Sequence, residues 1–142
     1  MAIGDPSDAA MDAFVARVVP AGLQPPARFH DLDAMIAHGI DALVIVTPHT
    51  QHATQIATAL AAGVHVLCEK PLTLSLSEAK AMFAAARQHG VMLLEAYPYY
   101  FQPQTGDMLS LLHSGAIGEV RFARAAYYAS RKAIAQAAIP AA

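Results

Sequence analysis

Apolar and polar residues follow two alternating patterns along most of the chain. Uninterrupted apolar runs of roughly four to eight residues are typical of buried strands, whereas apolar residues spaced three and four apart mark one face of a helix. The runs at residues 42–46, 64–68 and 91–94 therefore predict strands. Helical spacing separates them, over residues 51–62 and again from Ser75 to Gly90. This order predicts βαβ units, and hence an α/β fold with a parallel sheet.

The two intervening helices carry signals for their buried faces and for their ends. The first is expected to stop at Gly63 and to bury an apolar face formed by Ala53, Ile56, Ala57, Leu60 and Ala61. In the second, Ser75 is followed three residues later by Glu78, which is a capping-box signature. Its apolar stripe consists of Ala79, Met82, Phe83 and Ala86. We expect Met82 and Phe83, together with Met108 further along the chain, to lie in the core.

The flanking segments suggest two domains, each of them partial. Residues 8–18 and 31–38 have helical patterns, and residues 1–4 are interpreted as the stub of a strand. A parallel domain should not begin with such a stub, so residues 1–100 are expected to form a domain that lacks its first strand and the turn after it. Beyond it, a helix over 102–113 and a strand over 119–128 predict the truncated start of a second domain over residues 101–142. Residues 133–142 fit no element.

Composition narrows the possible partners. The net charge of −2 over 142 residues gives no electrostatic reason to expect nucleic acid or an anionic membrane as a partner. No apolar run approaches the length of about 20 residues that spans a bilayer. Cys68 is the only cysteine, which excludes an internal disulfide and agrees with a reducing cytoplasm. The acidic N-terminus, with no basic patch before an apolar core, is unlike a secretory signal.

Polar residues follow each of the three predicted strands. Thr47-Pro48 comes after the first strand, Glu69-Lys70-Pro71 after the second, and Glu95-Ala96-Tyr97 after the third. The carboxyl ends of parallel strands meet at one edge of a sheet, where ligands of α/β proteins bind. Pro71 restricts the backbone at Lys70, so we expect a lysine held at the rim of a ligand crevice.

Several stretches together resemble the Gfo/Idh/MocA family of NAD(P)-dependent oxidoreductases over nearly the whole chain. The residues that carry the resemblance are Val46-Thr47-Pro48, His52, residues 62–72 with Glu69-Lys70-Pro71, Ser77-Glu78-Ala79, Glu95-Ala96-Tyr97, Phe101, Pro103-Gln104 and residues 114–120. The resemblance implies a Rossmann domain followed by an α/β domain with an open antiparallel sheet. It also implies hydride transfer between NAD or NADP and a sugar-like or polyol-like substrate at a CH–OH or C=O group. A homo-oligomer is a further expectation.

The resemblance assigns roles to particular residues. Lys70 would be catalytic, lying beside the nicotinamide and stabilising the charge that develops on the reacting oxygen. The expected cofactor-binding residues are Asp5, Thr47, Pro48, His52, Glu69, Lys70 and Pro71, and the expected substrate-binding residues are Tyr97 and Tyr99. No metal site is expected. Asp5 would contact the adenosine ribose, which weakly favours NAD over NADP because a carboxylate repels a 2′-phosphate.

The chain also departs from the family. The glycine-rich phosphate loop and the downstream Asp/Gly/Tyr-or-His motif are absent, and Tyr100 and Gln102 replace an arginine and a histidine. We therefore expect the isolated chain to have impaired activity or none. The alternative is a non-catalytic remnant that associates with itself or binds a partner, and a receiver-like domain fits less well.

A purely structural role is also open for each of the candidate site residues. Lys70 and Glu69 could be surface residues, Thr47-Pro48 and Asp5 turn residues, His52 a helix-start residue, and Tyr97 and Tyr99 packing residues.

Overall fold

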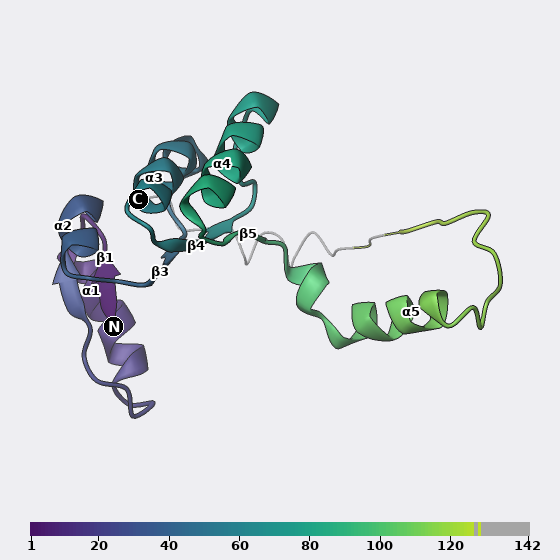
Figure 1. The fold of residues 1–142 in the computed structure, drawn as a ribbon. Coiled ribbons are helices and arrows are strands. Elements are labelled where there is room, and N and C mark those ends of the chain that lie inside the picture. Colours follow the sequence, from purple (N-terminus) through teal and green to yellow (C-terminus); the bar gives the residue numbers. More distant parts are fainter. Residues whose placement is uncertain (127, 129–142) are drawn as a thin grey trace. The chain divides into compact units, whose positions relative to one another are not determined.

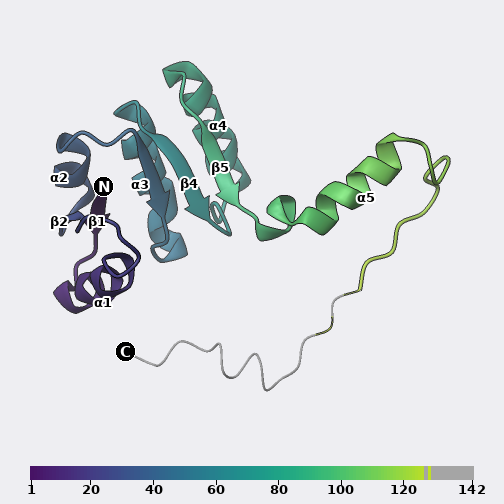
Figure 2. The same cartoon turned by 90° about the horizontal axis from the view of Figure 1, so that it is seen from below.

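The structure, a computed structural model, describes residues 1–126 and 128, and it divides into two units. The first unit comprises Met1–Pro98, and the second begins at Tyr99. Figure 1 labels most of the helices and strands along the chain, and Figure 2 also labels β2. In the first unit these are β1 (Ala2–Gly4), α1 (Asp8–Val18), β2 (Ala27–Phe29), α2 (Leu32–Ala37), β3 (Ala42–Ile45), α3 (His49–Ala61), β4 (His65–Glu69), α4 (Leu76–His89) and β5 (Leu93–Ala96).

Every strand pair in the described part of the first unit is parallel. Strands β3, β4 and β5 form one sheet in that order, and β1 and β2 form another. The α/β class with parallel strands is therefore confirmed. The three predicted strands all form, with bounds shifted by one or two residues. The short strand β2 was not predicted, because three residues are too few to show a period of two.

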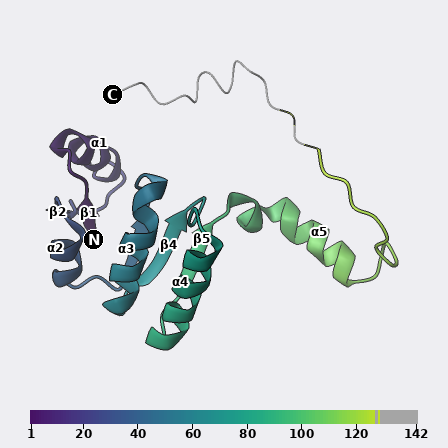
Figure 3. The same ribbon diagram turned by 90° about the horizontal axis from the view of Figure 1, so that it is seen from above.

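Helices α3 and α4 lie side by side on one face of the β3–β4–β5 sheet, as Figures 2 and 3 show from opposite sides. The residues of β3 alternate accordingly, since Leu43 and Ile45 are buried while Val44 is 63% exposed. The core between sheet and helices contains Leu43, Ile45, Ile56, Ala59, Leu60, Val64, Val66, Cys68, Leu72, Met82, Ala86 and Leu93. This core holds the carboxyl ends of the three strands in place.

Two predicted helix faces were partly wrong. In α3 the buried alanine is Ala59, whereas Ala57 and Ala61 are exposed. In α4 the buried residues are Met82 and Ala86, four positions apart. Phe83 is 40% exposed, because it lies one position further round the helix than Met82.

The ends of α4 confirm the predicted bounds but not the predicted cap. Ser75 occupies the N-cap position, yet its side chain makes no capping hydrogen bond. Its hydroxyl pairs with that of Ser77 at 2.7 Å, and Glu78 instead accepts a hydrogen bond from the Thr73 hydroxyl. The helix ends at Gly90, whose φ of +68° is a left-handed conformation that suits glycine.

The second unit contains η1 (Pro98–Phe101), which starts at the last residue of the first unit, and α5 (Pro103–His113). Helix α5 matches the predicted helix, with Pro103 in its first turn. Met108 is 54% exposed and not part of a core. The strand expected over 119–128 is not formed by the described residues of that range, which have no neighbouring strand to pair with. Residues 133–142 lie outside the described residues.

None of the helices in the described part of the chain is both long enough and apolar enough to cross a lipid bilayer.

Candidate functional site

The carboxyl ends of β3, β4 and β5 lie at the same level of the sheet. The register pairs Ile45 with Cys68, and Cys68 with Glu95. Thr47, Lys70 and Tyr97 each follow these aligned residues by two positions. The expected convergence of the three strand exits at one edge of the sheet is therefore confirmed.

His52 connects the first two strand exits. Its ring, on α3, is completely buried. Nε2 lies 2.9 Å from the carbonyl oxygen of Thr47, and Nδ1 lies 2.9 Å from the carbonyl oxygen of Pro71. Carbonyl oxygens only accept hydrogen bonds, so both contacts are hydrogen bonds only when both ring nitrogens carry a proton. The ring thus holds the segment after β3 to the segment after β4.

The exit of β3 is also held through its side chains. The Thr47 hydroxyl donates to Oε1 of Gln55 at 2.6 Å, and Nε2 of Gln55 donates to Oε1 of Gln51 at 3.2 Å. Pro48 is the N-cap residue of α3 and makes no side-chain capping bond. Thr47 is half-buried, and its hydroxyl oxygen keeps a lone pair with which it can accept from a ligand.

The exit of β4 presents two charged side chains. Glu69 and Lys70 are both exposed, and the Lys70 backbone N–H donates to Oε2 of Glu69 at 2.9 Å. Within residues 1–126 and 128, the Lys70 ammonium forms no ion pair. The Leu72 backbone N–H donates to Oε1 of Glu95 at 2.8 Å, which fastens this loop to β5. The Lys70 side chain is therefore available to a ligand at a backbone position that is tied to both neighbouring strands.

Asp5 and Thr47 line one cavity of about 350 Å³, at the carboxyl ends of β1 and β3. Its other polar lining residues include His30, Asp31, Gln51 and Gln55. One Asp5 carboxylate oxygen accepts from the Ser7 backbone N–H at 2.7 Å, and among residues 1–126 and 128 no hydrogen bond reaches the second oxygen. Glu69 and Lys70 do not line this cavity, and Pro71 lines a separate one of about 400 Å³ with Thr73 and Glu95.

The remaining candidates have the following places. Tyr97 is 53% exposed and Tyr99 is 46% exposed, and each has an interaction partner. Tyr97 belongs to the first unit, whereas Tyr99 belongs to the second. Among the described residues no group of three or more histidine, cysteine, aspartate or glutamate side chains could hold a metal ion.

Cys68 is buried between the strand exits and the helices. Burial, with smaller contributions from the charges of Glu69 and Glu95, raises the pKa of its thiol to about 11. The thiol therefore stays protonated near neutral pH and is a packing residue, not a nucleophile.

Sequence reasoning missed Gln55 and the bond from Leu72 to Glu95. The only available signal for Gln55 was its place one helical turn beyond Gln51, on the polar side of α3. Glu95 was noticed as a strand exit, but nothing in the sequence indicated that its carboxylate accepts from a backbone N–H 23 residues away.

The sequence profile of the Gfo/Idh/MocA family, described as an oxidoreductase family with an NAD-binding Rossmann fold, matches residues 1–97. Among curated relatives, dTDP-3,4-didehydro-2,6-dideoxy-alpha-D-glucose 3-reductase of Actinomadura kijaniata is 42% identical over 82 residues, which are 58% of this chain and 25% of the relative.

Two solved structures are similar in fold. A 3-ketoreductase from Actinomadura kijaniata in complex with NADP and TDP-benzene aligns with a TM-score of 0.70 and 32% identity, over 85% of this chain and 36% of that protein. Scyllo-inositol dehydrogenase from Lactobacillus casei with bound NAD(H) and scyllo-inositol aligns with a TM-score of 0.72 and 29% identity, over 84% and 34%. The chain therefore spans a quarter to about a third of the length of these proteins.

Proposed function

Because the chain belongs to the Gfo/Idh/MocA family of oxidoreductases, with a partial Rossmann fold, we propose that it forms the nicotinamide-cofactor half of a dehydrogenase. The cofactor, NAD or NADP, would bind at the carboxyl ends of β1, β3 and β4. The observation that carries this proposal is the alignment of the exits of β3 and β4, which His52 joins through Thr47 and Pro71.

The side chains at these exits suit a dinucleotide. The 350 Å³ cavity offers a carboxylate from Asp5 for ribose hydroxyls and a hydroxyl from Thr47 for an amide or hydroxyl. Pro48 would shape the turn between β3 and α3 beside this cavity. Glu69, Lys70 and Pro71 would border the nicotinamide end of the cofactor site. His52 is buried, so its contribution to cofactor binding would pass through the two carbonyls that it holds.

When bound, the nicotinamide ring accepts or supplies a hydride. The chain's own contribution to the reaction is Lys70, whose ammonium would donate a hydrogen bond to the oxygen of the reacting carbon. A fixed positive charge there stabilises negative charge that develops on that oxygen. It would also help to transfer the proton. Glu95 supports this role indirectly, by fastening the backbone just after Lys70.

The substrate class follows from the relatives, which act on a deoxysugar nucleotide or bind an inositol. We therefore propose a small polyhydroxylated substrate with a CH–OH or C=O group, with Tyr97 and Tyr99 among its contacts. Residues 1–100 would form the partial cofactor domain, and residues 101–142 the start of a substrate and oligomerisation domain. The whole enzyme would be a homo-oligomer. The single buried thiol supports a reducing cytoplasm as its compartment.

The preference for NAD over NADP rests on Asp5. Its carboxylate lines the cavity, and one of its oxygens is free of hydrogen bonds to the described residues. A negative charge at this place repels a 2′-phosphate and accepts from ribose hydroxyls. The similar proteins include one in complex with NADP and another with NAD(H), so the family alone leaves the choice open.

Cofactor binding can be tested by titrating NADH and ADP-ribose into the full chain while recording amide chemical shifts by NMR. Both ligands should shift Asp5 and Thr47, and only NADH should shift Lys70, because ADP-ribose lacks the nicotinamide. Lys70→Met should weaken NADH binding and leave ADP-ribose binding unchanged. Lys80→Met removes the same charge from an exposed site on α4 and should change neither. Absence of binding at millimolar NADH would refute the proposal for this chain.

A further inference from the structure

A histidine side chain takes part in holding the start of β5 against β4. The Met92 backbone N–H donates to Nδ1 of His65, the first residue of β4, at 2.9 Å. In the described part of the chain, this is the only hydrogen bond of that N–H. The Met92 carbonyl oxygen in turn accepts from the Val66 N–H at 2.8 Å. The His65 ring therefore closes the amino end of the contact between β4 and β5.

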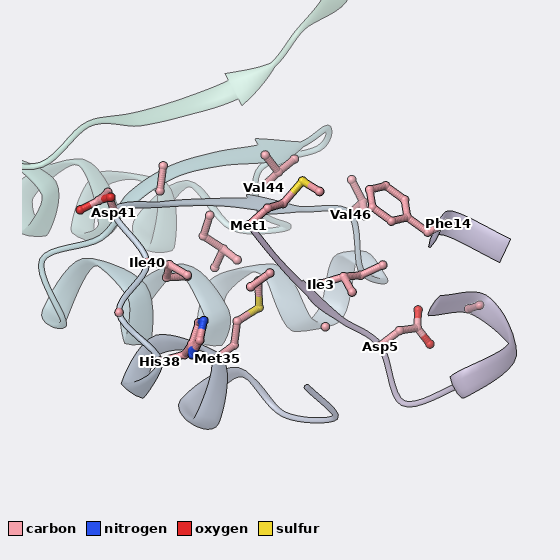
Figure 4. Close-up of a pocket in the computed structure, with 16 residues that line it drawn as sticks. Met1, Ile3, Asp5, Phe14, Met35, His38, Ile40, Asp41, Val44 and Val46 are labelled. Atoms are coloured by element: carbon pink, nitrogen blue, oxygen red, sulfur yellow. The ribbon is translucent and has the colours of Figure 1, made fainter. Parts of the chain in front are cut away.

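The backbone of His65 is tied to the other neighbouring strand. Its N–H donates to the carbonyl oxygen of Asp41 at 3.0 Å, and the residue is aligned with Ala42 of β3. Asp41 itself lines a cavity of about 870 Å³ beside β1 and β3 (Figure 4). The His65 ring is half-buried. His65 thus lies where the amino ends of three strands meet, at the opposite end of β4 from Lys70.

The bond from Met92 restricts the protonation of the His65 ring. An imidazole nitrogen accepts a hydrogen bond only through its lone pair, so Nδ1 carries no proton while it accepts from Met92. In the neutral ring the proton is then on Nε2. A second proton can bind only at Nδ1, where it would face the Met92 N–H as donor against donor. Protonation of the ring and this hydrogen bond therefore exclude each other.

The neighbouring strands present apolar side chains to the His65 ring. Side chains alternate along a strand, and Val66 and Cys68 are buried under the helices, so His65 lies on the opposite face of the sheet. The residues of β3 and of the β5 segment that share this face are Ala42, Val44, Met92 and Leu94. No charged side chain of either neighbouring strand therefore faces the ring.

The charged groups of the surrounding elements lie elsewhere. Glu69 shares the face of His65 but follows it by four residues, about 13 Å along the strand. Glu95 is half-buried on the face that α3 and α4 cover, and Arg87 and His89 lie in the last turn of α4. No ion pair among residues 1–126 and 128 includes His65. The bond from Met92 is therefore the main polar contact that proton binding to this ring would disturb.

We propose that His65 is an acid-sensitive latch on β5. While Nδ1 is unprotonated, it holds the Met92 N–H and keeps the amino end of β5 on β4. Protonation of the ring breaks this bond and leaves the Met92 N–H to water, so β5 opens more often from this end. Because the latched form excludes the second proton, acidification moves the equilibrium toward the open form. The inference goes beyond cofactor binding and does not depend on it.

Amide hydrogen exchange of the full chain tests the latch between about pH 8 and pH 5, the range in which histidine side chains ordinarily titrate. After correction for the intrinsic pH dependence of exchange, protection of the Met92 amide should fall roughly fivefold or more toward the acidic end, since one hydrogen bond is lost. The His65 amide, which donates to the Asp41 carbonyl oxygen, should change little. Nitrogen NMR at the alkaline end should show the His65 ring with its proton on Nε2.

A matched pair of variants separates this ring from the other histidines. His65→Asn places an amide oxygen near the position of Nδ1, which accepts a hydrogen bond but does not titrate. This variant should keep the Met92 amide protected over the whole pH range. His65→Leu removes the acceptor and should give low protection at every pH, while the His65→Asn variant keeps the test valid if His65→Leu does not fold.

Three results would overturn the proposal. One is Met92 protection in the parent chain that does not change with pH. Another is an equal loss of protection on acidification in His65→Asn, which would assign the effect to other groups. The third is a neutral His65 ring with its proton on Nδ1, since such a ring cannot accept from the Met92 N–H.

Discussion

Nδ1 of His52 lies 2.9 Å from the carbonyl oxygen of Pro71, 19 residues along the chain, in the loop that carries Lys70. With the second bond to Thr47, this contact makes a buried side chain the connection between two strand exits. The position of the Lys70 backbone therefore depends on α3 as well as on β4.

Replacing His52 with alanine should destabilise the first unit. The change leaves a cavity and removes the partners of two carbonyl groups, so the free energy of unfolding should fall by roughly 2–4 kcal/mol. Urea unfolding followed by circular dichroism measures this. His49→Ala removes the exposed neighbouring ring, 5.7 Å away, and should cost much less. Equal losses in the two variants would argue against the proposed connection.

Nitrogen NMR of the imidazole can test the two bonds of His52 directly. Because both partners are carbonyl oxygens, both contacts can be hydrogen bonds only with a proton on each ring nitrogen. A spectrum with one protonated nitrogen would mean that one of the two contacts is not a hydrogen bond.

Met82 on α4 faces the core and Phe83 does not, so truncating these two neighbours should lower the free energy of unfolding by different amounts. Met82→Ala should lower the free energy of unfolding by roughly 2–4 kcal/mol, because Met82 is 5% exposed. Phe83→Ala should cost clearly less, since that ring is 40% exposed. Chemical unfolding of both variants decides the matter, and a larger loss for Phe83→Ala would favour the face expected from the sequence.

Ionisation of the Cys68 thiol should lower the free energy of unfolding at alkaline pH. Its folded-state pKa of about 11 lies above the value of 9.0 for a thiol in water, so the folded chain holds this proton more tightly than the unfolded chain. The protonated thiol makes its full contribution to the free energy of unfolding below pH 9. As the pH rises toward 11 this contribution is lost, which lowers the free energy of unfolding by roughly 3 kcal/mol at most. Urea unfolding at several pH values measures the loss. Cys68→Ala should lose less stability over this range, and parallel curves for the two proteins would contradict the assignment.

Asp5→Asn should shift cofactor preference toward NADPH. The variant keeps an oxygen that accepts from the Ser7 N–H, so the turn is preserved while the charge is removed. Competition titrations of NADH against NADPH should show a relative gain for NADPH, and Asp33→Asn, an exposed carboxylate on α2, should show none. An unchanged ratio for Asp5→Asn would remove the basis for preferring NAD.

The sequence predicted features that depend on periodicity. The apolar runs identified β3, β4 and β5, and the glycines marked the ends of α3 and α4. The buried face of α4 was harder to predict, because Met82 and Phe83 are adjacent and only packing against the sheet selects one of them. Strand β2 is too short to carry a pattern.

At the site, the sequence predicted which residues follow the strands but not what holds them. The bonds of His52 end on main-chain carbonyls 5 and 19 residues away, and main-chain atoms carry no sequence signal. The same reason explains why the anchor from Leu72 to Glu95 was missed. Asp5 and Thr47 line one cavity only because β1 and β3, which belong to different sheets, approach each other, and the sequence did not predict this approach.

The division of the first unit into two sheets should limit how cooperatively it unfolds. The β1–β2 sheet has only three residues in each strand, and no ladder of main-chain bonds links it to β3. The β3–β5 sheet is backed by two long helices and contains most of the buried side chains. We therefore expect melting in stages, in which the N-terminal pair opens first and leaves a smaller folded nucleus that retains Lys70 and His52.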